Sequence, residues 1–84
     1  MAYLNKVFLI GNLGNDPKIR DLPDGDIVAS FSLATTHKYK SNGEAREQTD
    51  WHQVVVFKQL AAVARDYLKK GSSVHIEGRL RYRK

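Results

Sequence analysis

Aromatic and cationic side chains give this sequence its most distinctive chemistry. Trp51 and Phe57 lie six residues apart in a β-prone run, and Tyr39 lies between two lysines in a polar stretch. The cations that accompany them are Lys38, Lys40, Arg79, Arg81 and Lys84. Aromatic rings stack on flat bases and cations neutralise phosphates, a combination that binds single-stranded nucleic acid. The alternative, which periodicity alone leaves open, is that Trp51 and Phe57 are ordinary core residues.

The run from Thr49 to Phe57 carries two of these rings and reads as a β-strand, because it is rich in β-branched and aromatic residues and contains neither Gly nor Pro. Side chains alternate along a strand. One face therefore carries Trp51, Gln53, Val55 and Phe57, and the other carries His52, Val54 and Val56. Such a strand either is buried on both faces or buries its valines and presents its rings to a ligand.

Enzymatic chemistry finds little support. His37, His52 and His75 fall in different predicted elements and lack the spacing of metal ligands. No G-x-S-x-G motif is present. Residues 11–14 form a G-x-x-G, but a turn-rich stretch follows it instead of the helix that a phosphate-binding loop requires. We therefore predict no catalytic residue, no metal site and no cofactor, and we interpret these glycines as a bulge and a turn.

Length and composition limit the chain to one small domain. A chain of 84 residues buries only about 60% of its unfolded surface, so self-association would be an obvious source of stability. The absence of cysteine excludes disulfides and zinc-thiolate sites. Neither a membrane-spanning apolar run nor a signal-peptide pattern is present, so we expect a soluble, cytoplasmic protein.

The net charge of +5 and the pI of about 9.7 are compatible with a polyanionic partner. The distribution of charge is more informative than its sum. Acidic residues concentrate in 16–26 and 44–50, whereas residues 79–84 form a basic run with an aromatic residue inside it. That run is either part of a binding face or a solvated strand face.

Apolar periodicity and turn residues predict four strands and one helix. The strands are expected at 7–10, 27–35, 49–57 and 74–82, and the helix over 60–68 with Gly71 as its terminator. We expect close backbone approach or a bulge at Gly11, and a long flexible loop over 36–48 in which Asn42-Gly43 favours a tight turn. Phe31 and Tyr67 fall on apolar stripes and are predicted to lie in the core.

The order strand, strand, strand, helix, strand is that of a small oligonucleotide-binding (OB-fold) barrel without its fifth strand. We therefore predict an all-β chain that forms one OB-fold domain over residues 1–84, with one helix between the third and fourth strands. The missing strand implies either a fragment or a barrel closed by another chain.

Motifs along nearly the whole chain resemble those of bacterial single-stranded-DNA-binding proteins. The matching segments are Asn5-Lys6-Val7, Leu9 to Gly14, Asp16-Pro17, Phe31 to Thr35, Thr49 to His52, Val54-Val55, Phe57, Tyr67 to Ser72 and Ile76 to Leu80. They occur in the family's order and spacing. The resemblance implies an OB-fold, assembly as a homotetramer, and coating of single strands in DNA replication, recombination and repair.

The same resemblance implies that Trp51, Phe57 and Tyr39 stack on bases, and that the first strand and His52 lie near subunit contacts. The sequence also departs from the family pattern at several positions. Gln53 stands where relatives often place Arg, and Lys58-Gln59 replaces a common Gly-Lys. The loop after Tyr39 looks shorter than in many relatives. The fifth strand and the acidic tail that recruits replication and repair proteins are absent from the sequence given.

These observations predict a non-enzymatic protein that binds single-stranded DNA without sequence preference and works as a homo-oligomer. Stacking is assigned to Tyr39, Trp51 and Phe57. The candidate phosphate contacts are Lys6, Arg20, Lys38, Arg79, Arg81 and Lys84. We expect no membrane partner, and a bacterial, nucleoid-associated or phage-encoded protein in preference to an organellar one. The alternatives are a primosome or replication accessory protein with the same fold, and an oligomerisation module that does not bind DNA.

Overall fold

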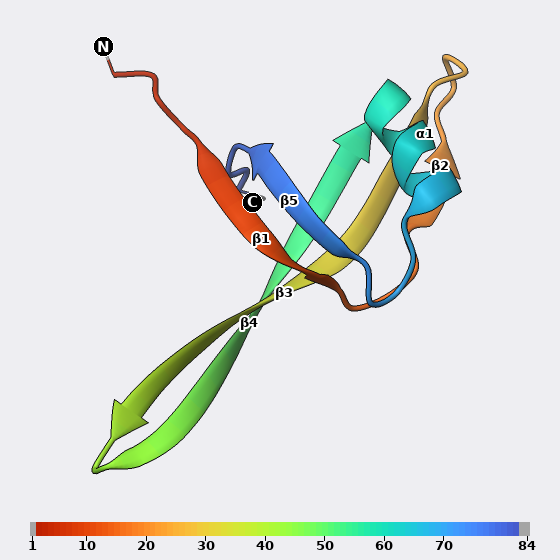
Figure 1. Cartoon of the computed structure of the whole chain (residues 1–84). Helices are drawn as coiled ribbons and strands as arrows, with labels where there is room; N and C mark the ends of the chain where they lie inside the picture. Colours follow the sequence, from red (N-terminus) through yellow and green to blue (C-terminus); the bar gives the residue numbers. More distant parts are fainter. Residues whose placement is uncertain (1, 83–84) are drawn as a thin grey trace.

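The structure is a computed structural model that describes residues 2–82, and it consists of one curled antiparallel sheet with a single helix packed on it (Figure 1). The elements in chain order are β1 (Val7–Leu13), β2 (Lys18–Asp21), β3 (Ile27–Ser41), β4 (Glu44–Phe57), α1 (Lys58–Tyr67) and β5 (Ser73–Gly78). The helix follows the strand that carries Trp51, as predicted.

Strand β3 is the centre of the sheet. Strand β4 pairs with one edge of β3, from Val28↔Phe57 to Ser41↔Glu44. The other edge of β3 is shared by β2, which pairs with residues 27–30, and β1, which pairs with residues 33 and 34. Strand β5 pairs with β1, so the order is β2-β3-β1-β5 with β4 on the remaining side of β3.

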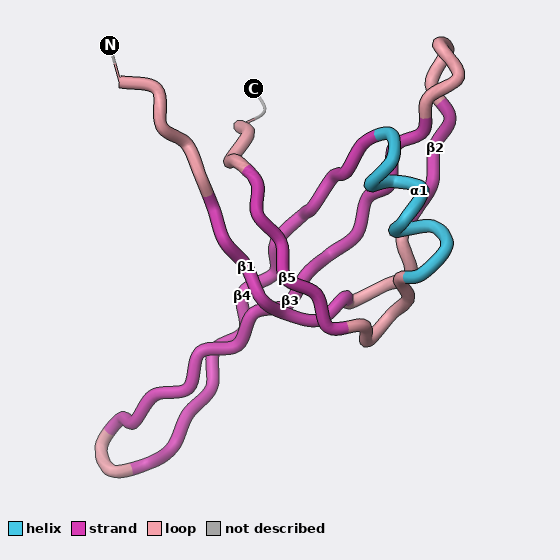
Figure 2. The backbone as a smooth tube through the Cα atoms, turned by 45° about the horizontal axis from the view of Figure 1, so that its top comes forward, coloured by secondary structure: helices cyan, strands magenta, loops and turns pink. Residues whose placement is uncertain are grey.

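The sheet curls into a half-barrel whose two open edges belong to β4 and β5 (Figures 1 and 2). Among residues 2–82, β4 pairs only with β3 and β5 only with β1. A groove of about 390 Å³ lies between α1 and β5, and its apolar lining includes Leu60, Val63, Leu68, Val74 and Ile76. The half-barrel is therefore open to solvent beside the helix.

Most of the core contributed by β3 comes from one face of the strand. Ala29, Phe31 and Leu33 are buried on this face, as predicted for Phe31, and Val28 is buried on the opposite face. Phe31 and Leu33 form one cluster with Leu13, and Val54 and Val56 of β4 pack against it. Ala29 forms a second cluster with Ala61 and Ala64 of α1. Leu9, Val74 and Ile76 complete the packing around the first cluster.

The helical spacing of Leu60, Val63, Ala64, Tyr67 and Leu68 predicts one apolar face, and this prediction is only partly right. Ala64 and Leu68 pack on the core, but Tyr67 is 79% exposed and Leu60 is also exposed. The prediction that Tyr67 lies in the core is therefore wrong. The contact is made by alanines, because Ala61 and Ala64 let the helix backbone approach Ala29 closely. Larger side chains at the flanks of this contact are displaced outward.

Residues 36–48, predicted as a flexible loop, instead extend β3 and β4 into one long hairpin. Its two-residue turn is Asn42-Gly43, with φ values of 52° and 80°. Positive φ at both positions is what a type I′ turn requires, so the turn prediction is confirmed while the loop prediction is wrong. The outer part of this hairpin projects from the body (Figure 2), which agrees with a radius of gyration of 15.5 Å against about 12 Å for a compact chain of this length.

Two further features differ from the prediction. The first is strand β2, which was not predicted. All four of its residues are exposed, so only its backbone pairing with β3 identifies it as a strand. Strand β5 ends at Gly78, where its partner Val7 begins β1, so residues 79–82 are not strand. Beyond Gly78 the Asn5 side chain forms hydrogen bonds with the backbone of Leu80. Asn5 Nδ2 donates to the Leu80 carbonyl (2.9 Å), and the Leu80 N–H donates to Asn5 Oδ1 (3.0 Å).

Gly11 provides the close backbone approach predicted for it. A Cβ atom at this position would overlap the carbonyl oxygen of Ala34. The bulge predicted as its alternative is absent on the β5 side, where Gly11 pairs with Val74 in continuous register. The glycine is therefore needed for β1 to cross closely over β3.

Lys58 begins α1 with a φ of 55°, in the left-handed region. This conformation costs a residue with a Cβ about 1–2 kcal/mol, and glycine adopts it without that penalty. We predict that Lys58→Gly raises the free energy of unfolding by about 1 kcal/mol, measured by urea denaturation. Gln59→Gly, one residue further into the helix, is the control and should lower stability by about 0.5–1 kcal/mol. A loss of stability in both variants would contradict the prediction.

Candidate nucleic-acid interface

The outer face of β4 presents the predicted aromatic side chains to solvent. Trp51 is 64% exposed and Phe57 is 56% exposed, whereas Val54 and Val56 on the opposite face pack against the core. The structure therefore decides between the two alternatives for this strand: its valines are buried and its rings are exposed. Six residues of extended chain separate the rings by about 20 Å, a distance that leaves room for several nucleotides between them.

Trp51 is positioned by the connection between β1 and β2. A Cβ atom at Gly14 would overlap the six-membered part of the Trp51 ring, so the ring lies directly against this glycine. The connection is itself fixed to β3, because the Gly14 N–H donates to the Ser32 carbonyl (2.8 Å) and the Ser32 N–H donates to Asn15 Oδ1 (2.9 Å). Gly14 was predicted only as a turn residue, and nothing in its local sequence indicates the contact with Trp51.

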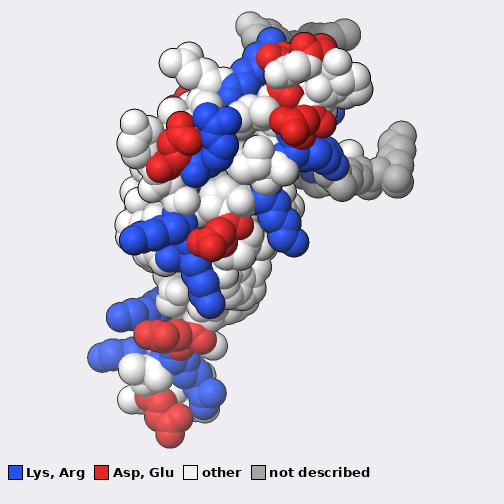
Figure 3. Space-filling model, turned by 90° about the vertical axis from the view of Figure 1, so that its right-hand side faces the viewer, with Lys and Arg blue, Asp and Glu red and all other residues white. Residues whose placement is uncertain are grey.

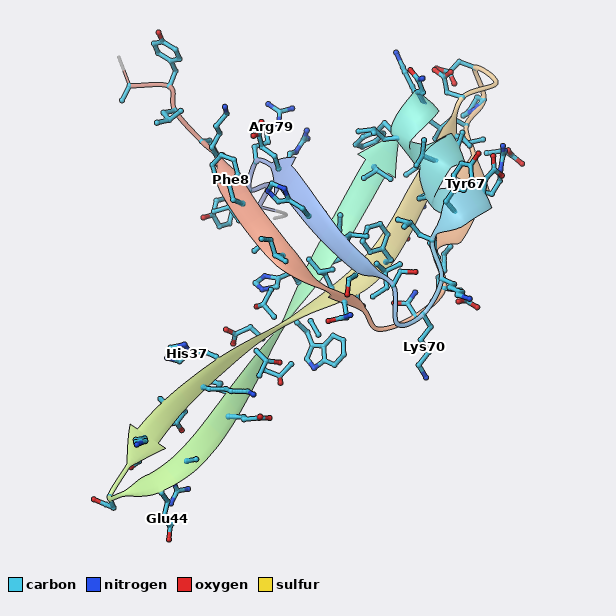
Figure 4. All side chains as sticks on the ribbon, viewed as in Figure 1. Phe8, His37, Glu44, Tyr67, Lys70 and Arg79 are labelled. Carbon is cyan, nitrogen blue, oxygen red and sulfur yellow. The ribbon has the colours of Figure 1, made fainter. Side chains whose placement is uncertain are left out.

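Tyr39 lies on the other face of the β3–β4 ladder. Paired residues share a face, and Ala34 pairs with Trp51 whereas Tyr39, five residues on, pairs with Arg46. The Tyr39 ring is stacked with that of His37, with centroids 6.0 Å apart and planes 12° apart. Figure 4 shows His37 on the part of the hairpin that projects from the body. Figure 1 also shows that β3 and β4 cross between the body and the arm, so the ladder turns between Trp51 and Tyr39. The structure thus brings Trp51 and Phe57 to the outer face of β4 and places Tyr39 apart from them, on the projecting arm.

Two of the predicted phosphate contacts form ion pairs within the chain. Lys6 Nζ lies 3.7 Å from Glu77 Oε2, and Lys38 Nζ lies 3.8 Å from Glu47 Oε1. Both pairs are well exposed, and such pairs contribute only about 0–1 kcal/mol. Phosphates could therefore replace the carboxylates, although Lys6 and Lys38 would have to exchange a partner to bind them.

The remaining predicted cations are exposed. Arg20 lies on β2, and Arg79 and Arg81 follow β5; Lys84 lies outside the described residues. On the face that Figure 3 presents, Lys and Arg side chains are interleaved with Asp and Glu and do not form one continuous basic patch. The position of each cation relative to the aromatic face therefore matters more than the net charge.

Lys18 is exposed on β2 but was not among the predicted contacts. Its segment, Lys-Ile-Arg-Asp, was expected to be irregular, so no face could be assigned to it. Only the pairing of Lys18 with Ser30 shows that it belongs to the sheet.

His52 lies on the inner face of β4 and has a partner within the chain, because its Nε2 is 2.9 Å from Thr35 Oγ1. Within residues 2–82, no three His, Cys, Asp or Glu side chains come together as a metal site would require. The helix in this part of the chain is too short and too polar to cross a membrane.

A curled antiparallel half-barrel, with a helix after its aromatic strand and exposed rings on its outer face, defines an oligonucleotide-binding fold. Residues 4–84 match the model of the single-strand binding protein family, and the chain belongs to this family. The chain is also similar to the solved structure described as Plasmodium falciparum SSB complex with ssDNA. The two share 39% sequence identity at a TM-score of 0.87, over 94% of this chain and 72% of that one. The predicted fold class and family are therefore confirmed.

Proposed function

We propose that this protein binds single-stranded DNA without sequence preference, with bases stacked on Trp51 and Phe57. The observation that carries the proposal is the difference in burial between the two faces of β4. This strand buries Val54 and Val56 in the core yet exposes more than half of each large ring on its outer face. Burial of aromatic area is a major source of stability, so leaving two rings in solvent on one face is best explained by a ligand with flat groups. Family membership and the DNA complex of the similar protein support the same ligand.

We assign the phosphate contacts to the predicted cations. Arg20, Arg79 and Arg81 are exposed on β2 and after β5, while Lys6 and Lys38 would exchange their carboxylate partners for phosphates. Tyr39 would contact a part of the DNA that reaches the projecting arm of the hairpin. We further propose that the protein acts in DNA replication, recombination and repair, as the family does. These roles require binding to single strands of any sequence.

Titration with oligo-dT tests this function. Trp51 is the only tryptophan of the chain, so stacking on it should quench the intrinsic fluorescence. Neutralisation of phosphates should make log affinity fall with log salt concentration, by about 0.7 for each phosphate contacted on a single strand. Affinity that does not depend on salt, or binding without quenching, would reject the corresponding part of the proposal. An equally strong response to duplex DNA would reject its single-strand preference.

We also propose that the protein assembles as a homo-oligomer through the outer face of β1. Phe8 and Ile10 lie on this face and are 60% and 75% exposed. His75 of β5 lies beside Phe8, with ring centroids 6.4 Å apart. An exposed apolar pair on a sheet surface is typical of a protein contact. The resemblance to the family, which implies subunit contacts near the first strand and usually a tetramer, supports the same face.

A further inference from the structure

Strand β2 carries its cations in register with the aromatic strand. Ser30 of β3 pairs with Lys18 on one side and with Val55 of β4 on the other. Two residues earlier on β3, Val28 pairs with Arg20 on one side and with Phe57 on the other. Two parallel rows therefore cross the sheet, each running from a cation on β2 over β3 to an apolar side chain on β4.

The cations and the rings lie on the same outer face. Ala29 packs against α1 on the inner face, so its partner Ile19 also points inward. Asp21 pairs with Ile27, which packs against the same cluster of Ala29 and helix alanines, so Asp21 also lies on the inner face. Because side chains alternate along β2, Lys18 and Arg20 must point outward.

Between β2 and β4, the outer face of β3 contributes Ser30 beside Lys18 and Val28 beside Arg20. Ser30 is small and Val28 is only 5% exposed, so neither side chain projects far above the sheet. Neighbouring strands are about 4.8 Å apart. The cations of β2 and the rings of β4 thus flank a shallow strip about 10 Å wide. The base and the phosphate of a nucleotide lie on opposite sides of its sugar, so one strand laid along this strip could place its bases over β4 and its phosphates over β2.

The charges of β2 are available to such a strand. Within residues 2–82, neither Lys18 nor Arg20 forms an ion pair, in contrast to Lys6 and Lys38. The acidic residue on the same strand, Asp21, faces the helix. Asp24 and Asp26 lie in the turn that follows, where Asp24 Oδ1 accepts the Asp26 N–H (3.0 Å). No carboxylate of β2 therefore lies on the outer face beside Lys18.

From this register we infer that Lys18 and Arg20 form the phosphate-binding edge of the DNA site, and that the bound strand runs alongside β4 with its bases over the Phe57 end and its backbone over β2. The inference rests on the proposed function and adds a residue, Lys18, and a path for the DNA. Lys18 and Arg20 are two residues apart on one side of a strand, about 6.6 Å, so they can contact successive phosphates of one chain.

The test is the salt dependence of oligo-dT binding by Lys18→Gln. Loss of one phosphate contact should make the slope of log affinity against log salt shallower by about 0.7, and Lys18→Gln combined with Arg20→Gln should change it by about twice as much. Quenching of Trp51 at saturation should be retained, because the bases still stack. Lys18→Arg should restore the slope.

Lys69→Gln is the matched control. It removes the same charge from an exposed side chain without an ion pair among the described residues, just beyond α1, which covers the inner face. The slope should be unchanged in this variant. Equal slopes in Lys18→Gln and Lys69→Gln would overturn the inference while leaving the proposed function intact. Failure of the unmodified protein to bind oligo-dT would instead overturn the proposed function. Circular dichroism confirms folding of each variant.

Discussion

Replacement of Trp51 by alanine is expected to lower the affinity for oligo-dT by at least about tenfold while the fold survives. Stacking of a base on an aromatic side chain is worth about 1–3 kcal/mol, and about 1.4 kcal/mol corresponds to a factor of ten. Trp51 is mostly exposed and lies against Gly14 instead of filling the core. Its removal should therefore take away a contact surface for DNA without opening a cavity.

The variant lacks the only tryptophan, so binding is followed by fluorescence anisotropy of a labelled oligo-dT. Tyr67→Ala is the control, because it removes an even more exposed ring from α1 on the other side of the sheet. Its affinity should match that of the unmodified protein. Trp51→Phe should retain part of the binding, since it keeps a π-face. Unchanged affinity in Trp51→Ala, with a normal circular dichroism spectrum, would refute the stacking role of this residue.

Substitution of Ile10 by aspartate is expected to dissociate the proposed oligomer. Ile10 is exposed in the single chain, so the change should be tolerated by the fold. In an interface formed by the outer face of β1, however, the carboxylate would lose its hydration with only its cross-strand neighbour His75 beside it, and burial of a charged group is costly. Size-exclusion chromatography with light scattering should then give a mass near that of one chain, 9.5 kDa, where the unmodified protein gives a multiple of it.

Tyr67→Asp is the control for that substitution. Tyr67 is also exposed but lies on α1 and does not line the groove beside β5, so the oligomer should persist. A single-chain mass for the unmodified protein at every concentration would exclude the oligomer. An unchanged mass for Ile10→Asp would show that a different face mediates assembly.

Alternation along β4 predicted which side chains share a face, but it left open whether the face with the rings is buried. The structure shows Val54 and Val56 packed on the core and Trp51 and Phe57 exposed on the opposite face. The buried face of β3 followed from the same rule. Tyr67 was misplaced because the helical periodicity counts apolar residues equally, whereas the contact with Ala29 selects small side chains.

The hairpin arm and β2 could not be predicted because neither buries a face. Residues 36–40 and 42–50 are exposed on both sides of the ladder, so no apolar alternation marks them as strand. Backbone pairing and cross-strand contacts such as Thr36 with Thr49 (3.2 Å) hold them instead. Without the strand, the face of Tyr39 could not be assigned, and without β2 the outward direction of Lys18 could not be recognised.

The exposed arm of the β3–β4 hairpin also makes the stability of the molecule uneven. Its outer residues gain no burial on either side, so their free energy of local opening is set by the ladder and the Asn42-Gly43 turn alone. Near Leu33 the same two strands pass through the buried core, so we expect them to open only together with the rest of the domain. Contacts proposed at Tyr39 would then have to offset the entropy of ordering the arm, whereas those proposed at Trp51 would not. We therefore expect the same stacking chemistry to contribute less affinity at Tyr39 than at Trp51.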